Sequence, residues 1–178
     1  MPVNKTRRVG LGPPIQSWWG KPHPTIVSGF GALLMLLVVI TILPASTFGK
    51  TVAEWDFSKG LQGWAGNNHV ENLSSSPEGL VVKSTGEDPW IEGPAVDLPR
   101  DKTIRVRIRM KSSADAGAEL FYGRVFKAGD SVPFTARADE QWHDYALVIR
   151  DKLGPGTRFR LDPCVGPGDV TVAFIKAE

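Results

Sequence analysis

Cysteine is almost absent from this sequence, whose 178 residues include only Cys164. A lone thiol cannot form a disulfide within the chain, and a CxxC-type metal motif needs a second cysteine. The sequence also lacks a phosphate-binding P-loop, a dinucleotide-binding glycine motif and a Gly-x-Ser-x-Gly turn. These motifs carry much of the chemistry of nucleotide-binding proteins and serine hydrolases. We therefore expect a chain that is stabilised by its hydrophobic core and has no catalytic activity, no cofactor and no metal.

Charged residues are absent between Pro22 and Gly49, and this stretch contains an apolar run over residues 26–43. About 20 apolar residues in a helix, at 1.5 Å each, span a hydrocarbon core of about 30 Å. The apolar region of a cleaved signal peptide is shorter, at about 7–15 residues. The run therefore predicts an uncleaved transmembrane helix over residues 26–44.

Acidic residues are absent from the first 49 positions, whereas four basic residues precede the apolar run: Lys5, Arg7, Arg8 and Lys21. Such an excess of positive charge keeps that side of a membrane helix in the cytoplasm. We expect a basic cytoplasmic tail over residues 1–25, an inner-membrane helix, and a periplasmic or extracellular C-terminal part. Three residues are expected at the membrane interface, where indole and amine groups favour the lipid headgroups: Trp18, Trp19 and Lys21.

Small residues gather near the start of the predicted helix: Ser28, Gly29, Gly31 and Ala32. Ser28 and Ala32 are four positions apart and share one helix face, which lets another helix approach closely. Ionisable side chains are absent from the span, which argues against a proton or ion path. We expect this helix to contact the bilayer and other membrane-protein subunits.

The rest of the chain is nearly neutral. From position 50 it has 19 acidic and 17 basic residues, the latter being all 21 less the four in the tail. A nucleic-acid-binding domain normally has a basic body, so no nucleic-acid partner is expected. Amphipathic helical stretches are also absent, and Pro- and Gly-rich turns separate short apolar segments.

These short segments are typical of an antiparallel β-sandwich. A tether over residues 45–53 is expected to join this sandwich, residues 54–178, to the membrane helix. The expected strands are 52–57, 79–84, 103–111, 118–123, 143–150, 157–162 and 169–176.

Basic and apolar residues alternate along the segment TIRVRIRMK, residues 103–111. Successive side chains of a strand point to opposite faces of the sheet. The apolar set is therefore expected in the core: Ile104, Val106, Ile108 and Met110. The basic set is expected on a wet face, opposite acidic residues of neighbouring strands: Arg105, Arg107, Arg109 and Lys111. The alternative is a face that binds an anion or lipid headgroups.

Three parts of the chain resemble galactose-binding-like jelly rolls, the fold of many carbohydrate-binding modules. They are Glu54–Trp64, Trp142–Tyr145, and the paired segments Arg158–Pro163 and Gly166–Ile175. The resemblance covers residues 52–178 and implies an all-β antiparallel sandwich of about eight strands, often with sugar binding. Some members of this family hold a structural calcium. In this chain the possible carboxylate ligands are Asp56 and Asp162. Calcium takes 6–8 oxygen ligands, so two carboxylates are weak evidence for such a site.

Sugar binding requires exposed aromatic rings with polar groups beside them. In this resemblance the candidates are Trp90, Tyr122 and Trp64. The alternative for each is a place in the core, where large aromatic side chains of a small sandwich usually lie.

Three functions fit these features. The first is a non-catalytic accessory subunit of a larger membrane complex, with the helix packed among other helices and the sandwich capping partners outside. A photosynthetic reaction-centre and light-harvesting complex is the first candidate, because the basic tail with its tryptophans loosely resembles an antenna polypeptide, although the span lacks a pigment-ligating histidine. The alternative is a membrane-anchored carbohydrate-binding module for envelope glycans. A third hypothesis is an anchored sensor whose face at 103–111 contacts anionic lipid.

Overall fold

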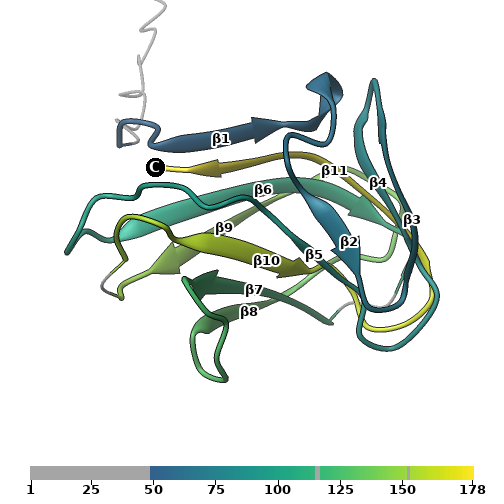
Figure 1. The fold of residues 1–178 in the computed structure, drawn as a ribbon. Coiled ribbons are helices and arrows are strands. Elements are labelled where there is room, and N and C mark those ends of the chain that lie inside the picture. The colour runs from purple at the N-terminus through teal and green to yellow at the C-terminus, as the bar shows by residue number, and fades with distance from the viewer. Residues whose placement is uncertain (1–48, 115–116, 152) are drawn as a thin grey trace, which may run out of the picture. The chain divides into compact units, whose positions relative to one another are not determined.

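The computed structural model describes residues 49–178, with the exception of 115–116 and 152, as two antiparallel sheets packed face to face (Figure 1). One sheet has six strands and the other has five. The six-stranded sheet contains β1 (Ala53–Asp56), β3 (Val70–Ser76), β4 (Gly79–Ser84), β6 (Ile104–Ser112), β9 (His143–Ile149) and β11 (Gly168–Ala177). The five-stranded sheet contains β2 (Ala65–Asn67), β5 (Trp90–Glu92), β7 (Gly117–Gly123), β8 (Ser131–Thr135) and β10 (Arg158–Asp162). A 3-10 turn, η1 (Phe57–Lys59), follows β1.

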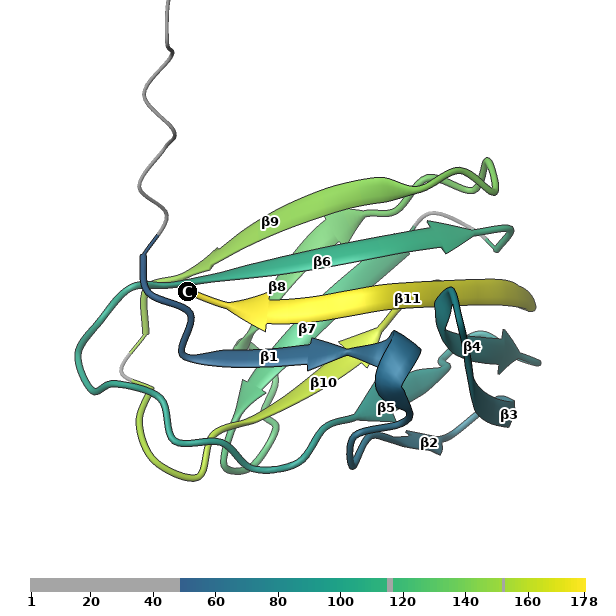
Figure 2. The ribbon, with the colours of Figure 1, turned by 90° about the horizontal axis from the view of Figure 1, so that it is seen from above.

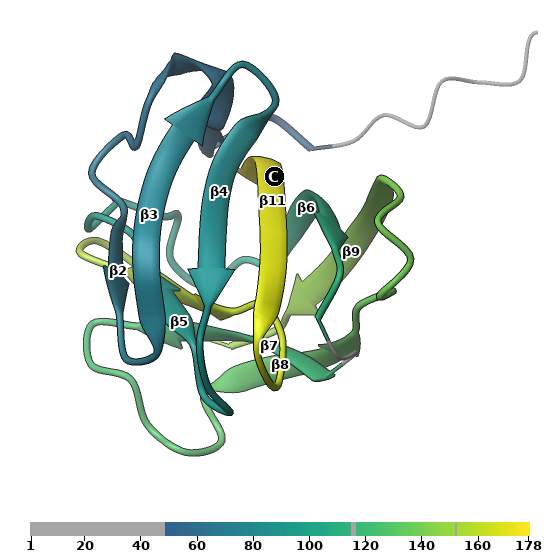
Figure 3. The same cartoon turned by 90° about the vertical axis from the view of Figure 1, so that its right-hand side faces the viewer.

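The last strand, β11, lies at the centre of the six-stranded sheet, whose order is β3-β4-β11-β6-β9. Its first half pairs with β4 and its second half pairs with β1, while β6 runs along its other side. Figure 2 shows β11 between β1 and β6, and Figure 3 shows β3, β4 and β11 side by side. A register shift between Val172 and Phe174 interrupts its pairing with β6.

The five-stranded sheet has the order β2-β5-β10-β7-β8. Strand β10 lies in its middle, with Arg160 opposite both Glu92 on β5 and Phe121 on β7. Directly opposed residues of an antiparallel pair project from the same face. This register therefore brings three side chains from distant parts of the sequence together on one side of the sheet.

The core lies between the two sheets, and strand alternation explains its composition. As predicted, the apolar set of β6 faces inward, because Ile104, Val106, Ile108 and Met110 are at most 1% exposed. A cluster of aromatic rings joins the sheets at one end, where Trp55 of β1 packs edge-to-face against Phe159 of β10 with centroids 5.9 Å apart. Burial of each such large apolar side chain stabilises the fold by about 1.5–3 kcal/mol.

The predicted all-β antiparallel sandwich is confirmed, and each of the seven predicted strands is present with ends that differ by at most one residue. Four further strands were missed. Strand β3 reads VENLSSS, and its only two apolar residues, Val70 and Leu73, are too few to show an alternation. Strand β8 contains Pro133, which is tolerated because β8 lies at a sheet edge. Strands β2 and β5 have three residues each, too few to show a period.

The predicted membrane helix at 26–44, the tail at 1–25 and the first part of the tether lie outside the described residues. So do the residues assigned to helix packing and to the membrane interface: Ser28, Gly29, Gly31, Ala32, Trp18, Trp19 and Lys21. In the part of the chain that the structure describes, no helix is long and apolar enough to cross a membrane.

The turn into β4 generates a stability prediction. Gly79 has a φ of +141°, and a Cβ at this position would lie 2.2 Å from the carbonyl oxygen of Val172 on β11. Gly79→Ala is therefore expected to lower the free energy of unfolding by about 3 kcal/mol, since it adds backbone strain and pushes β11 away.

The matched control is Gly129→Ala, whose φ is also positive, at +93°, but whose Cβ would have no heavy atom within 4 Å. This substitution should lower the free energy of unfolding by only about 1 kcal/mol, because it adds backbone strain without a steric clash. Urea unfolding of both variants measures the difference, and equal losses would contradict the described packing of β4 on β11.

Candidate functional site

The outer face of the five-stranded sheet combines aromatic rings with many charged side chains. On β10 the residues Phe159 and Leu161 are fully buried, so their neighbours point away from the core. The same alternation on β5 and β7 completes a half-buried outer set: Trp90, Glu92, Glu119, Phe121, Arg158, Arg160 and Asp162. We call these seven residues the aromatic–acidic face.

The centre of this face is the guanidinium group of Arg160, which lies between two aromatic rings. Its Cζ atom is 4.5 Å from the ring centroid of Trp90 and 4.8 Å from that of Phe121. Cations over aromatic faces at such distances are attracted by the ring quadrupole. Arg160 Nε and Nη2 also donate to Asp162 Oδ1 and Oδ2 over 2.7 and 2.6 Å, a bidentate pair that fixes the plane of the guanidinium.

Carboxylates outnumber guanidinium groups on and beside this face. Arg158 is paired with Glu92, and Glu119 accepts a hydrogen bond from the Ser131 hydroxyl. A further carboxylate, that of Asp88, lies 3.6 Å from Arg160 Nη2. The two arginines are therefore engaged by acids of the same sheet or its rim, and the local charge is negative: Asp88, Glu92, Glu119 and Asp162 against Arg158 and Arg160.

Burial raises the pKa of Asp162 above its ordinary value of 3.8, and the negative charges of Asp88 and Glu119 raise it further. The hydrogen bonds and positive charge of Arg160 act in the opposite direction. The Arg160–Asp162 pair is thus a charged pair that the sheet and its neighbours partly remove from water. Such a pair is costly to break, because the remaining charge would have no partner.

Two loops at one end of this face are joined by hydrogen bonds around Asp88. Asn68 Nδ2 donates to the Asp88 carbonyl oxygen over 2.6 Å, and the Asp88 N–H donates to His69 Nδ1 over 3.2 Å. These contacts hold the β4–β5 loop against the β2–β3 loop, just before Trp90. A cavity of about 240 Å³ lies beside them, lined by Glu87, Asp88, Gly117, Ala118, Glu119, Asp162, Cys164 and Val165.

Of the three predicted ligand-binding aromatics, the structure places Trp90 on this face. Trp64 is 2% exposed, with its ring edge-to-face against Trp55 and Phe57 at 5.5 and 5.7 Å. Tyr122 is 6% exposed, and its hydroxyl donates to Asp151. Burial, together with this bond, raises the pKa of Tyr122 to about 12. In this structure Trp64 and Tyr122 present no ring face to a ligand, and they pack in the core.

Sequence reasoning missed Phe121 and Arg160. Phe121 follows Leu120 on β7, and because Leu120 is fully buried, Phe121 takes the outer side that Tyr122 was expected to supply. The sequence contained this signal. Phe121 is two positions from Glu119, so the two side chains share the outer face of β7, whereas Leu120 and Tyr122 share the inner face. Arg160 similarly stands between two core residues of β10.

The two carboxylates considered for calcium lie in different sheets. Asp56 ends β1 and accepts hydrogen bonds from the Ser58 N–H and hydroxyl over 3.2 and 2.7 Å, with Lys59 Nζ at 2.9 Å. Asp162 is held by Arg160 on β10. Among the residues that the structure describes, no group of three or more His, Cys, Asp or Glu side chains could hold a metal ion.

The basic residues of β6 face outward from the six-stranded sheet, as predicted, and acidic side chains pair with three of them. Arg107 Nη1 lies 3.9 Å from Glu178. Arg109 Nη1 lies 2.7 Å from Asp144 on β9, its cross-strand neighbour, and Lys111 Nζ lies 2.8 Å from Glu78. The Trp142 ring lies over both cations, 5.6 Å from Arg109 Cζ and 5.0 Å from Lys111 Nζ. This face resembles an ion-paired sheet surface more than an open binding site for anions.

Comparison with known proteins gives structural matches only. No protein-family model matches the sequence, and no curated protein is similar to it in sequence. The apo CBM1 module of BiXyn10A matches with a TM-score of 0.58 and 15% identity, over 72% of this chain and 98% of that one. The CBM22-1 xylan-binding domain of Paenibacillus barcinonensis Xyn10C matches with a TM-score of 0.54 and 14% identity, over 75% and 97%.

A CBM4 structure matches with a TM-score of 0.51 and 12% identity, over 68% of this chain and 99% of that one. The sandwich has the fold of carbohydrate-binding modules. At these identities the similarity extends to the fold alone, and function has to be argued from the residues of this chain.

The Arg160–Asp162 pair generates a prediction for acid titration. In Arg160→Met the pKa of Asp162 should rise further above 3.8, because the substitution removes the hydrogen bonds and positive charge that lower it. Carboxyl carbon NMR across the acidic range measures the midpoint. Asp139 is the internal control, because its pKa is lowered chiefly by the hydrogen bond with His143 and should not move.

The contribution of Asp162 to the free energy of unfolding should also fall as the pH rises from 3.8 through its raised pKa, because the folded state binds this proton more tightly than the unfolded state does. The difference between wild type and Asp162→Asn isolates this contribution. An Asp162 that titrates below 3.8, or that is unaffected by Arg160→Met, would contradict the described pair.

Proposed function

We propose that this chain is a non-catalytic glycan-binding protein. Its sandwich binds a polysaccharide of the cell envelope across the aromatic–acidic face, and the predicted helix at 26–44 anchors it to the membrane. The observation that carries this proposal is the row Trp90–Arg160–Phe121, in which two partly exposed rings are held apart by one guanidinium group and flanked by carboxylates. The similarity of the fold to carbohydrate-binding modules supports it.

The chemistry of this row suits a sugar. A pyranose ring has apolar C–H patches that pack on aromatic rings, and hydroxyls at its rim that hydrogen-bond to charged groups. The rings belong to strands of the sheet, and the bidentate pair of Arg160 with Asp162 limits their movement. Such preorganisation favours binding, because few side chains have to be ordered when the ligand arrives.

The charge of the face favours a neutral glycan over an anionic one. Both arginines are engaged by carboxylates, and the acidic surplus would repel a uronate or a sulfate group. Xylan is a reasonable first probe, because one of the similar structures is a xylan-binding domain.

The accessory-subunit hypothesis has less support. Its main residues lie outside the described part of the chain, and none of the similar structures reported above is a subunit of a photosynthetic complex. Glycan binding and membrane anchoring are compatible, so the anchor remains part of the proposal without a partner complex.

Replacement of Trp90 tests the proposed face directly. Trp90→Ala should weaken polysaccharide binding by about 2 kcal/mol, roughly thirtyfold, the size of effect seen when a central aromatic anchor is removed. Affinity electrophoresis of the full-length chain in gels that contain soluble xylan or mixed-linkage β-glucan measures the loss.

The matched control is Phe174→Ala, which removes a half-buried ring on the opposite sheet, where it lies 5.8 Å from Arg107 Cζ. It should leave polysaccharide binding unchanged. Equal retardation of wild type and Trp90→Ala in every gel that retards the wild type would place the binding site elsewhere.

The class of polysaccharide forms a separate prediction. At low ionic strength the chain should bind neutral xylan or β-glucan at least tenfold more tightly than polygalacturonate, because carboxylates on both sides would repel each other. Added salt should screen this repulsion and reduce the difference. Preferential binding of polygalacturonate that weakens with salt would show that cations of the face receive the ligand, contrary to the proposal.

A further inference from the structure

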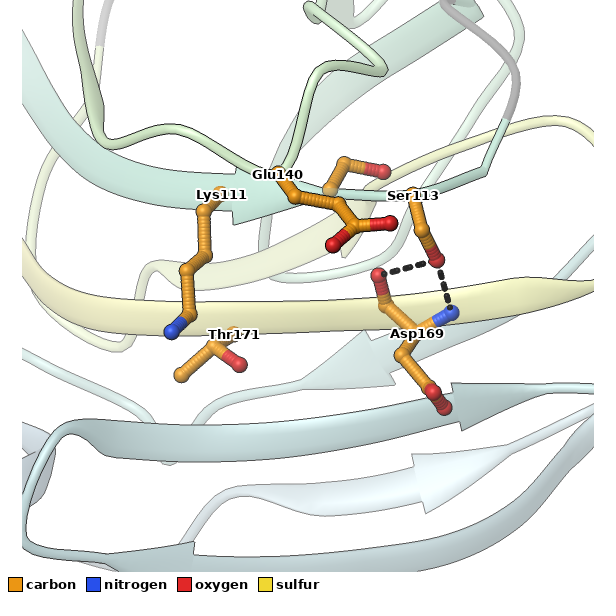
Figure 4. A pocket seen from close by; sticks show the side chains of 6 residues that line it. Lys111, Ser113, Glu140, Asp169 and Thr171 are labelled. Carbon is orange, nitrogen blue, oxygen red and sulfur yellow. Dashed lines mark hydrogen bonds between the residues drawn. The ribbon is translucent and has the colours of Figure 1, made fainter.

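A second polar cavity, of about 220 Å³, opens on the outer side of the six-stranded sheet, away from the aromatic–acidic face. It lies where β6 ends and β11 begins, beneath the loop between β8 and β9 (Figure 4). Its lining residues are Lys111, Ser112, Ser113, Glu140, Asp169 and Thr171. The cavity is smaller than the roughly 300–1,000 Å³ typical of drug-sized ligand sites, so it suits one small ligand rather than a polymer segment.

Three side chains present different hydrogen-bonding groups to this cavity. Lys111 and Thr171 are cross-strand partners on β6 and β11 and therefore share a face. Figure 4 shows Glu140 above the sheet, between Lys111 on one side and Ser113 on the other, with its carboxylate on the side of Ser113 and Asp169. An ammonium donates, a carboxylate accepts, and a hydroxyl does both. Together they match the alternating donors and acceptors of vicinal sugar hydroxyls.

The remaining groups hold the site in shape. The Ser113 hydroxyl accepts a hydrogen bond from the Asp169 N–H over 2.9 Å and lies 3.3 Å from the Asp169 carbonyl oxygen. These two contacts hold the end of β6 against the start of β11. Lys111 Nζ uses one donor on Glu78, at 2.8 Å, and the Trp142 ring lies 5.0 Å away. An ammonium has three donors, so Lys111 retains capacity for a ligand.

Glu140 is held in an unfavourable backbone conformation, with a φ of +58°. Its N–H donates to the Ser112 carbonyl oxygen over 2.9 Å, which fastens the loop to the end of β6. A side chain other than glycine at positive φ costs free energy, and such residues cluster at binding sites. Among the described residues, the Glu140 carboxylate has no hydrogen bond or ion pair, so it is available to a ligand.

We propose that this cavity is a second sugar-binding site, which takes a single neutral sugar residue such as a chain end or side branch. Glu140 accepts from one hydroxyl, Lys111 donates to its neighbour, and Thr171 bonds a third. The Trp142 ring lies 5.0 Å from Lys111 Nζ, next to the residues that line the cavity. A carboxylated or phosphorylated ligand is disfavoured, because Glu140 and Asp169 would repel it.

The test is an NMR titration of the full-length chain in a detergent without a sugar headgroup, with the indole N–H signals assigned by tryptophan substitution. The probes are the methyl glycosides of xylose, glucose, galactose, mannose and N-acetylglucosamine, with glucuronate as the anionic comparison. The Trp142 signal reports this cavity and the Trp90 signal reports the aromatic–acidic face. Failure of one site is therefore distinguished from failure of the other.

At least one neutral glycoside should shift the Trp142 signal at millimolar concentrations, in wild type and in Trp90→Ala alike, whereas glucuronate should not. Glu140→Gln should weaken this binding about tenfold through loss of a charge-assisted hydrogen bond. Glu140→Gly should abolish it while raising Tm by about 3 °C, because glycine relieves the positive φ.

Three results would overturn the proposal. They are a Trp142 signal that no neutral glycoside moves, a titration that Glu140→Gln leaves unchanged, and equal or tighter binding of glucuronate. The Tm of Glu140→Gly shows that any loss of binding is not a loss of the fold.

Discussion

Strand β11 is the element on which the rest of the sandwich depends. It pairs with β4, β1 and β6, so three of the other five strands of its sheet bond directly to it. Its inward side chains Val170, Val172 and Ile175 are fully buried. Because β1 and β11 stand at opposite ends of the described chain, the sheet is completed only when residues more than 100 positions apart meet. Such non-local pairing carries a loop-closure cost before any contact is made.

The same strand alternation that fills the core creates two chemically different outer faces. On the six-stranded sheet, three of the four basic residues of β6 pair with acidic side chains, as Arg109 pairs with Asp144. On the five-stranded sheet, carboxylates exceed guanidinium groups, and two rings remain partly exposed around Arg160. The strongest pattern in the sequence thus marks a neutralised surface. The aromatic–acidic face, which we propose as the binding face, comes from strands with weak patterns, in particular β5 and β7.

Sequence periodicity predicted which side chains of a single strand face the core. It did not predict which side chains of neighbouring strands come together, because that depends on the register of the strands. The inward set of β6 follows from its alternation alone. Trp90 was named as a candidate because sugar binding requires exposed aromatic rings, and the structure places it on the outer face of β5. Tyr122 was chosen in place of Phe121, an error of one position that reverses the face of a strand. The stack around Arg160 could not be foreseen, because it requires the register of β10 against both β5 and β7.

The central claim is that the aromatic–acidic face binds a neutral glycan. The most direct measurement is backbone amide mapping of the full-length chain by NMR during titration with xylohexaose, cellohexaose and mannohexaose in turn. The account predicts that at least one of them perturbs amides of β5, β7 and β10 in a saturable way and leaves β1, β3 and β4 unaffected. If none of the three perturbs these strands, or if every saturable change lies elsewhere on the sandwich, the claim is wrong.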